Sequence, residues 1–357
     1  MSATRQAPLP VPFRLQRGGT LQDGTIAFET WGTLDAARSN AVLLYTGLSP
    51  SAHAASSPGD PQPGWWEPMI GPDAPLDTRR LFIVCVNSLG SCFGSTGPAS
   101  IDPRSGRRYG KDFPELALED IARGGGEVLR HLGIGRAHAV VGASQGGMVA
   151  LAHLALFPGG ARHLVSISGT MAATPYAVAL RSIQRDAVMA DPAFRGGDYP
   201  PDDPPRAGLA LARKVGTVTY RSAEELGQRF GRSPSREGRD FAVQDYLAQQ
   251  AARFAGSFDA NSYLRLSRAM DLFDLAAHGA PPEVLRRSGL ESALVVGVEL
   301  DHLFTVQEQA ALADALRAGG IDTTFARLDS LAGHDAFLVD FPAFEATLRP
   351  WLAARSP

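Results

Sequence analysis

One stretch, from Ala139 to Leu151, constrains the fold more than any other part of the chain. An apolar run ends there in Gly142-Ala143-Ser144-Gln145-Gly146, and a helix-like sequence follows at once. Small residues are needed two before and two after the serine, because a side chain there would collide with the neighbouring strand and helix. The pattern is typical of a nucleophile elbow, in which a serine lies on a sharp turn between a strand and a helix. The alternative is an ordinary glycine-rich turn.

Apolar runs that alternate with helix-like segments surround this turn. We expect strands at Ile26–Thr30, Asn40–Thr46, Leu81–Val86, His138–Gly142, Leu164–Ser168, Ala293–Gly297 and Thr323–Leu328. Runs that are apolar throughout are typical of strands that are buried on both faces. Strands that alternate with helices predict an α/β fold, with a mostly parallel central sheet and helices on both of its faces.

A long segment between two of the predicted strands has a different pattern of apolar and polar residues. From residue 171 to residue 288 the sequence is helical and of mixed polarity, and it contains the proline-rich segment Tyr199–Pro205 but no clear β run. We therefore expect a catalytic core made of residues 1–170 and 289–357, with a helical lid inserted at residues 171–288.

The composition excludes several classes of function. Lys and Arg number 34 and Asp and Glu 37, for a net charge of −3, so neither nucleic acid nor an anionic membrane is expected as a partner. Met1–Pro8 lacks the apolar core of a secretory signal, and no run of about 20 apolar residues occurs, so we expect a cytoplasmic protein without a membrane span. The two cysteines, Cys85 and Cys92, fit a reducing compartment. No metal-ligand spacing appears, so no metal is expected.

A serine hydroxyl becomes a nucleophile when a histidine takes its proton and a carboxylate orients that histidine. After a nucleophile elbow these partners follow in the order Ser, Asp or Glu, His, each at the carboxyl end of a strand. Asp301 follows the strand at 293–296, whereas Glu299 is expected to point to the other side. His334 follows the last strand. The sequence therefore predicts the catalytic triad Ser144, Asp301 and His334.

The reaction at such a serine also needs two donors that stabilise an oxyanion. In this arrangement one donor is the backbone N–H of the residue after the nucleophile, here Gln145. The second comes from the loop after an earlier strand, and it is best placed at Leu48. Both donors belong to the backbone, so the identity of these side chains is not decisive.

Further motifs extend over almost the whole chain. They are Tyr45-Thr46-Gly47-Leu48-Ser49-Pro50, Gly64-Trp65-Trp66, Asn87-Ser88-Leu89-Gly90, Gly94-Ser95-Thr96-Gly97-Pro98, Gly142-Ala143-Ser144-Gln145-Gly146-Gly147-Met148, Ala212-Arg213-Lys214, Thr219-Tyr220-Arg221-Ser222, Phe230-Gly231-Arg232 and Gly333-His334-Asp335-Ala336-Phe337-Leu338. In these motifs the chain resembles the homoserine/serine O-acyltransferases of methionine and cysteine biosynthesis, which are a branch of the α/β-hydrolase fold. One departure is Gln145, where methionine is more usual.

The resemblance implies a double displacement. Ser144 takes an acyl group from acyl-CoA, and the hydroxyl of L-serine or L-homoserine then removes it, with no bound cofactor. Arg213 would hold the carboxylate of this acceptor, since a guanidinium suits that group, and Asp335 would hold its ammonium group. The alternatives are a surface charge on a lid helix for Arg213 and a helix N-cap for Asp335. Relatives also imply a homodimer that forms through the insertion.

The resemblance also bears on the two substrates. Gly47-Leu48-Ser49-Pro50 resembles the branch that acylates L-serine with succinyl-CoA. In this loop Pro50 would stiffen the backbone and shorten the acceptor pocket by about one methylene. A succinyl group carries a free carboxylate, and we expect it to meet Arg181 or Arg185 at the entrance of the lid. Homoserine as acceptor, acetyl-CoA as donor, and a plain esterase that uses water remain alternatives.

Overall fold

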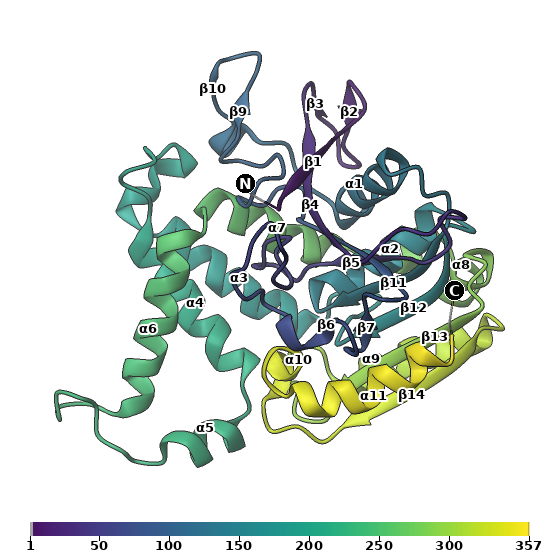
Figure 1. The fold of residues 1–357 in the computed structure, drawn as a ribbon. Helices are drawn as coiled ribbons and strands as arrows, with labels where there is room; N and C mark the ends of the chain where they lie inside the picture. Colours follow the sequence, from purple (N-terminus) through teal and green to yellow (C-terminus); the bar gives the residue numbers. More distant parts are fainter. Residues whose placement is uncertain (1–2, 356) are drawn as a thin grey trace.

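The computed structural model describes residues 3–355 and 357. Its centre is a sheet with the strand order β1-β4-β8-β5-β11-β12-β13-β14 (Figure 1). The strands are β1 (Arg5–Pro8), β4 (Thr25–Trp31), β5 (Ala41–Tyr45), β8 (Phe82–Val86), β11 (Ala137–Ala143), β12 (Ala161–Ile167), β13 (Ser292–Val298) and β14 (Asp322–Leu328). β1 pairs with β4, and β4 with β8, in antiparallel fashion, while the other neighbours are parallel. The predicted α/β class is confirmed.

Side chains of the central strands alternate between two buried faces of the sheet. Leu43 and Val140 belong to a core that also contains residues of α1 (Leu118–His131), α2 (Gln145–Leu156) and α9 (Val306–Ala318). Val42 and Val141 face the other way, toward α11 (Phe341–Ala353). Because both faces are covered, the central strands β5, β8 and β13 are buried throughout and do not alternate between apolar and polar residues.

Helix α1 lies close to the sheet because of its glycines. A Cβ on Gly125 would lie 2.2 Å from Tyr45 Oη, and one on Gly124 would lie 2.8 Å from a side-chain carbon of Ile26. The Tyr45 hydroxyl donates a hydrogen bond to the carbonyl oxygen of Ala122 in the same helix, at 3.0 Å. The triplet Gly124-Gly125-Gly126 therefore serves close packing.

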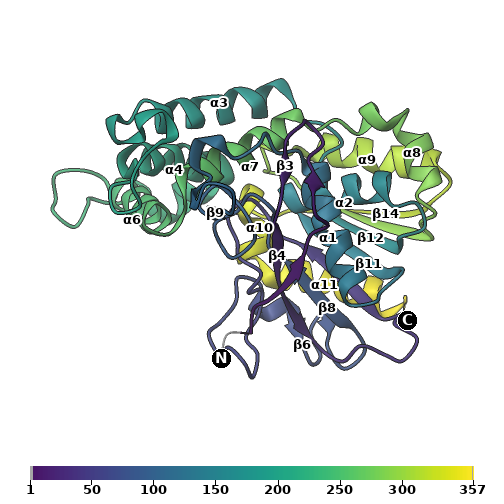
Figure 2. The same cartoon turned by 90° about the horizontal axis from the view of Figure 1, so that it is seen from above.

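The insertion between β12 and β13 is helical. It contains α3 (Pro175–Met189), α4 (Arg206–Tyr220), α5 (Ala223–Phe230), α6 (Ala242–Ser257), α7 (Ala260–Leu272) and α8 (Pro281–Arg287). Helices α3, α4 and α6 stand together to one side of the sheet (Figures 1 and 2), whereas α8 packs against α2 and α9. The lid boundaries at residues 171 and 288 stay a prediction.

The remaining elements are short and lie mostly in the connections. They are β2 (Phe13–Arg14), β3 (Thr20–Leu21), β6 (Ile70–Gly71), β7 (Leu76–Asp77), β9 (Ile101–Asp102), β10 (Arg107–Arg108), α10 (Ala336–Val339) and the 3₁₀ helices η1 (Glu67–Met69), η2 (Gly110–Asp112), η3 (Pro192–Gly197), η4 (Leu275–His278) and η5 (Gly333–Asp335). Across the described residues, none of the helices combines the length and the apolar character that crossing a membrane requires.

Candidate active site

Ser144 lies on a strained turn between β11 and α2. Its backbone has φ 56° and ψ −124°, a conformation that non-glycine residues rarely adopt. A Cβ on Gly142 would lie 2.1 Å from the carbonyl oxygen of Gly146, and one on Gly146 would lie 2.3 Å from that of Tyr45. Glycine is therefore required at both positions. The turn lifts the Ser144 side chain out at the carboxyl end of β11.

The structure brings Ser144, His334 and Asp301 together. His334 Nε2 lies 2.7 Å from Ser144 Oγ, and His334 Nδ1 lies 2.7 Å from Asp301 Oδ2. With the proton on Nδ1, that nitrogen donates to Asp301, and Nε2 can accept the proton of the serine hydroxyl. Glu299, the other acid in this segment, pairs instead with Arg327 at 2.6 Å. The arrangement is that of a Ser-His-Asp catalytic triad.

The Asp301 carboxylate is held by the backbone of its own loop. Its Oδ1 atom accepts hydrogen bonds from the N–H groups of Leu303 and Phe304, both at 2.9 Å. These two donors fix the carboxylate so that Oδ2 faces His334. The side chain is buried, which strengthens its electrostatic effect on the imidazole.

The His334 ring is enclosed by aromatic side chains. The Phe304 ring stacks on it with a centroid distance of 4.9 Å, and the Tyr220 ring from the lid lies at 5.7 Å. Burial alone lowers the pKa of His334, but the charge and hydrogen bond of Asp301 outweigh this effect and raise its pKa above the usual 6.5. His334 is thus a stronger base than a free histidine.

Two backbone N–H groups beside Ser144 fit an oxyanion hole. Among the described residues, the N–H groups of Leu48 and Gln145 donate no hydrogen bond to another protein atom. Leu48 also lines the cavity that contains Ser144. The Gln145 side chain is fully buried, and its amide nitrogen donates to Ser88 Oγ at 3.4 Å. It is directed into the protein interior, so its departure from the family leaves the backbone donor in place.

A cavity between the core and the lid contains the nucleophile. It encloses about 380 Å³ of space, open solvent at its mouth included. The core supplies Ser144, Leu48 and Phe304 to its wall, and the insertion supplies Leu180, Arg181 and Tyr220. The insertion therefore covers the serine, as a lid does.

Arg213 on α4 is a half-buried cation without an ion-pair partner among the described residues. Its guanidinium lies over the rings of Phe254 and Tyr220, at 4.8 and 5.6 Å from their centroids, and its buried Nε atom has no hydrogen-bond partner. Arg213 is not in the wall of the serine cavity, but its neighbour Tyr220 is. An unpaired guanidinium in this setting can receive a carboxylate.

Asp335 lies directly after His334, and it contacts the lid. Its Oδ2 atom lies 3.2 Å from Arg221 Nε. Asp335 occupies the N-cap position of α10, but its side chain makes no capping hydrogen bond to that helix. Burial raises the pKa of Asp335, and the charges of Arg221, His334 and Arg213 act against that rise. Reasoning from sequence missed Arg221, although it lies within the motif Thr219–Ser222.

Arg181 and Arg185 lie on α3 of the lid. They form a largely buried cluster with Asp271 of α7, with distances of 2.5 Å from Arg181 Nε and 2.6 Å from Arg185 Nη2. The Asp271 carboxylate draws both guanidinium groups toward α7, and a contact of either arginine with the acyl group stays a prediction. Arg181 alone of the two lines the serine cavity, and its buried Nη2 has no hydrogen-bond partner.

The loop Gly47–Pro50 begins two residues after the end of β5 and lies beside the elbow. A Cβ on Gly47 would have only ordinary contacts, at 3.8 Å from Pro50 and 3.9 Å from the Ala143 carbonyl. The carbonyl oxygen of Pro50 accepts a hydrogen bond from the Asn87 side chain at 3.4 Å. The effect of Ser49 and Pro50 on the length of the acceptor stays a prediction.

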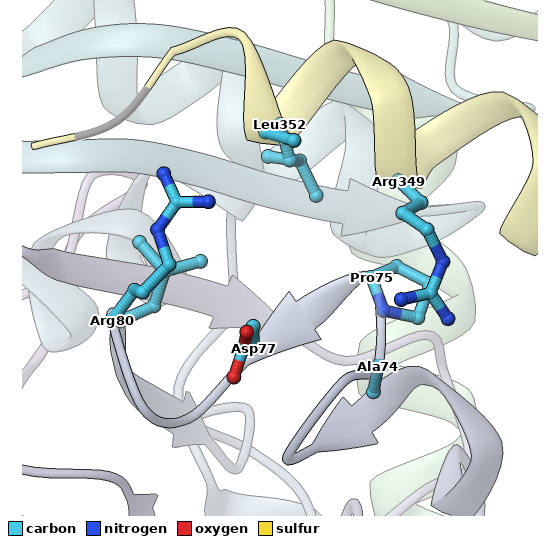
Figure 3. A pocket seen from close by; sticks show the side chains of 8 residues that line it. Ala74, Pro75, Asp77, Arg80, Arg349 and Leu352 are labelled. Carbon is cyan, nitrogen blue, oxygen red and sulfur yellow. The ribbon is translucent and has the colours of Figure 1, made fainter.

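A second cavity lies between α11 and the segment that includes β7 (Figure 3). Ala74, Pro75, Asp77 and Arg349 are part of its wall. It also includes Leu81, which precedes β8, so the cavity lies at the amino ends of the parallel strands. Ser144 is at their carboxyl ends, where ligands of such sheets bind.

Comparison with known proteins places the chain in a family. The model of the alpha/beta hydrolase fold matches residues 40–341. A serine O-succinyltransferase of Litchfieldella anticariensis is 51% identical over 99% of both chains. An L-serine/homoserine O-acetyltransferase of Streptomyces lavendulae is 51% identical over 98% of this chain and 97% of that protein. Among solved structures, esterase E22 has a TM-score of 0.89 at 26% identity and covers 99% of this chain and 100% of its own.

These likenesses extend over nearly the full chain. The structure also has a serine nucleophile under a lid, in hydrogen-bond contact with His334, which in turn is in hydrogen-bond contact with Asp301. The chain belongs to the alpha/beta hydrolase fold family and, within it, to the serine and homoserine O-acyltransferases.

Proposed function

We propose that the protein transfers a succinyl group from succinyl-CoA to the hydroxyl of L-serine by way of an acyl-serine at position 144. The observation that carries the proposal is the hydrogen-bonded chain from Ser144 through His334 to Asp301, enclosed under a lid. The choice of substrates is supported by the 51% identity to a serine O-succinyltransferase along the full chain.

The first half-reaction forms the acyl-enzyme. His334 Nε2 takes the proton of Ser144 Oγ as the oxygen attacks the thioester carbonyl carbon. The N–H groups of Leu48 and Gln145 stabilise the oxyanion of the tetrahedral intermediate. The C–S bond then breaks, His334 returns the proton to the sulfur, and CoA leaves as a free thiol.

The second half-reaction runs through the same groups. The hydroxyl of L-serine gives its proton to His334 Nε2 and attacks the carbonyl carbon of the acyl-enzyme. The bond to Ser144 Oγ breaks, and that oxygen recovers the proton. The product is O-succinyl-L-serine, with free Ser144 ready for another turnover.

The lid supplies the groups that recognise the substrates. Arg181 Nη2, buried and without a partner in the cavity wall, suits the free carboxylate of a succinyl group, and Asp271 keeps its guanidinium in place. Arg185 also binds Asp271, and its Nη1 atom donates a hydrogen bond to Ser267 Oγ at 2.9 Å, which holds the cluster in place. Arg213 would hold the carboxylate of the acceptor and Asp335 its ammonium group.

We further propose a cytoplasmic homodimer that works in cysteine biosynthesis. The two cysteines are free thiols, as expected in a reducing compartment. The insertion exposes large apolar side chains on neighbouring helices, among them Tyr176 and Ile183 on α3 and Leu211 and Val218 on α4. Covering this surface by a second copy would remove it from water.

A plain esterase is the second candidate, since the likeness to esterase E22 covers the whole chain. In an esterase, water would replace the amino acid. The two functions are distinguished by whether turnover depends on the acceptor, because both use Ser144, His334 and Asp301.

The deciding experiment measures thiol release from succinyl-CoA and acetyl-CoA, each with L-serine, with L-homoserine and without an acceptor. We expect the fastest steady turnover with succinyl-CoA and L-serine. Equal release without any amino acid would reject the transferase in favour of hydrolysis. Faster turnover with L-homoserine or with acetyl-CoA would reject the assigned acceptor or donor. Arg213→Ala should raise the KM for L-serine much more than it slows acylation, whereas Lys214→Ala, on the exposed side of the same helix, should change neither.

A further inference from the structure

The junction between α4 and α5 connects the lid to the loop of the catalytic histidine. Ser222 Oγ caps α5 by accepting a hydrogen bond from the N–H of Glu225, and it donates to the carbonyl oxygen of Leu331. A Cβ on Gly333 would lie 3.1 Å from both the Ser222 nitrogen and the Tyr220 carbonyl oxygen, so the two segments are in close contact.

Arg221 lies at the centre of this junction, and its side chain is 11% exposed. Its Nε atom is 3.2 Å from Asp335 Oδ2, and its Nη1 atom donates to Glu225 Oε1 at 3.1 Å. The three side chains form a charged row from Glu225 through Arg221 to Asp335. Among the described residues, neither oxygen of Asp335 accepts a hydrogen bond: Arg221 acts on Oδ2 as an ion-pair partner, and Oδ1 is left for a ligand.

We propose that Arg221 is a positioning residue of the acceptor site, which holds Asp335 so that its free oxygen faces the ammonium group of the amino acid. This inference rests on the proposed function, in which Asp335 binds that ammonium group. Arg221 itself does not touch the acceptor. It acts on binding through the position and the charge of the Asp335 carboxylate.

The charges around Asp335 explain why this carboxylate needs such a partner. Its burial raises its pKa, as does the nearby charge of Glu225, while Arg221, His334 and Arg213 lower it. A protonated carboxyl group cannot form an ion pair with an ammonium group. Arg221 has the largest lowering effect of the three cations, so its removal shifts the pKa of Asp335 upward and weakens acceptor binding as the pH falls.

The test compares Arg221→Gln, Arg221→Lys and Asp335→Asn with the wild-type enzyme. The KM for L-serine and the rate of thiol release in the first turnover are measured across the range from about pH 6 to about pH 9. Arg229→Gln is the matched control, because Arg229 also lies near Glu225, at 3.9 Å, but does not contact Asp335.

We expect Arg221→Gln to raise the KM for L-serine about 10- to 100-fold, with the largest increase at low pH and with first-turnover acylation nearly unchanged. Acylation at the wild-type rate shows that the variant is folded and that its triad is intact. Arg221→Lys keeps the positive charge, so the pH dependence of its KM for L-serine should stay close to that of the wild-type enzyme. Arg229→Gln should behave as wild type, and adding Arg221→Gln to Asp335→Asn should raise the KM no further.

The outcomes separate the two proposals. If Asp335→Asn leaves the KM for L-serine unchanged, the ammonium assignment in the proposed function is wrong, and the inference on Arg221 is wrong with it. If Asp335→Asn raises the KM but Arg221→Gln neither raises it nor shifts its pH dependence, the role of Arg221 alone is refuted. An equal loss of acylation and of acceptor binding in Arg221→Gln would also refute it, since that result indicates a general structural role.

Discussion

Asp301→Asn tests the assigned base directly, because the substitution changes one atom of the carboxylate and keeps its shape. Oδ1 of Asp301 accepts from the N–H groups of Leu303 and Phe304, and Oδ2 faces His334 Nδ1. The asparagine oxygen should therefore stay with the two backbone donors. Its NH₂ group then faces Nδ1, which must accept, so the imidazole proton moves to Nε2 and that nitrogen can no longer take the proton of Ser144.

The size of the effect follows from these contacts. Turning the amide around would restore the correct tautomer of His334, but it would leave two buried N–H donors facing an NH₂ group. Each unsatisfied buried donor costs about 1–3 kcal/mol, so the turned form lies at least about 2 kcal/mol higher and is populated to no more than about 3%. The rate should thus fall at least about 30-fold, and up to about 10⁴-fold where tautomer loss is complete, or about 5.4 kcal/mol in the barrier.

The assay is the rate of thiol release in the first turnover with succinyl-CoA, followed by the rate of acyl transfer to L-serine. Both half-reactions use His334, so both should slow by a similar factor. Glu299→Gln is the matched control, since Glu299 lies two residues away and pairs with Arg327, and it should stay within about twofold of wild type. A loss of less than about tenfold in Asp301→Asn would refute the reasoning on the tautomer.

Two other predictions follow from single contacts. Because Asp301 raises the pKa of His334 above 6.5 and the neutral imidazole is the base, kcat/KM for the acyl donor should fall with decreasing pH through a midpoint above 6.5; a midpoint below this value would contradict the assigned coupling. Gly125→Ala should lower the free energy of unfolding by about 1–3 kcal/mol in thermal or denaturant unfolding, since its Cβ would lie 2.2 Å from Tyr45 Oη. Gly135→Ala is the control, because a Cβ there would have no atom within 4 Å, and it should leave the stability unchanged. Equal stability of the two variants would disprove the close packing of α1.

The elements that the sequence predicts well are those fixed by local physics. Strands β5, β8, β11 and β13 are apolar throughout because both faces of the sheet are covered. The elbow is recognisable because the surrounding backbone leaves no room for a Cβ at positions 142 and 146. This requirement is visible within five consecutive residues of the sequence. Ser144, Asp301 and His334 could be assigned because they lie, in that order, in the segments that follow β11, β13 and β14.

The elements that could not be predicted depend on partners that are distant in the sequence. Arg181 and Arg185 lie inside the lid because Asp271, on another helix, binds both of them. Arg221 gains its significance from Asp335, which belongs to the last part of the core. Charged residues carry no periodic signal that would reveal such pairs, so only the folded chain brings them together.

Short or irregular segments were equally hard to read from the sequence. Strand β1 has four residues, three of them exposed, and it was not predicted as a strand. The long loop after β5 has no periodicity, yet its Trp66 is fully buried and donates a hydrogen bond to the carbonyl oxygen of Phe337 at 2.9 Å. This bond ties the loop to the segment that follows His334.

The most direct test of the central proposal is the mass of the protein after brief incubation with succinyl-CoA. We expect a gain of one succinyl group on the peptide that contains Ser144, and its complete loss within one turnover when L-serine is added, with O-succinyl-L-serine as the product. Ser144→Ala should gain no such mass. A succinyl group that persists in the presence of L-serine, or that also appears on Ser144→Ala, would contradict the proposed transfer through Ser144.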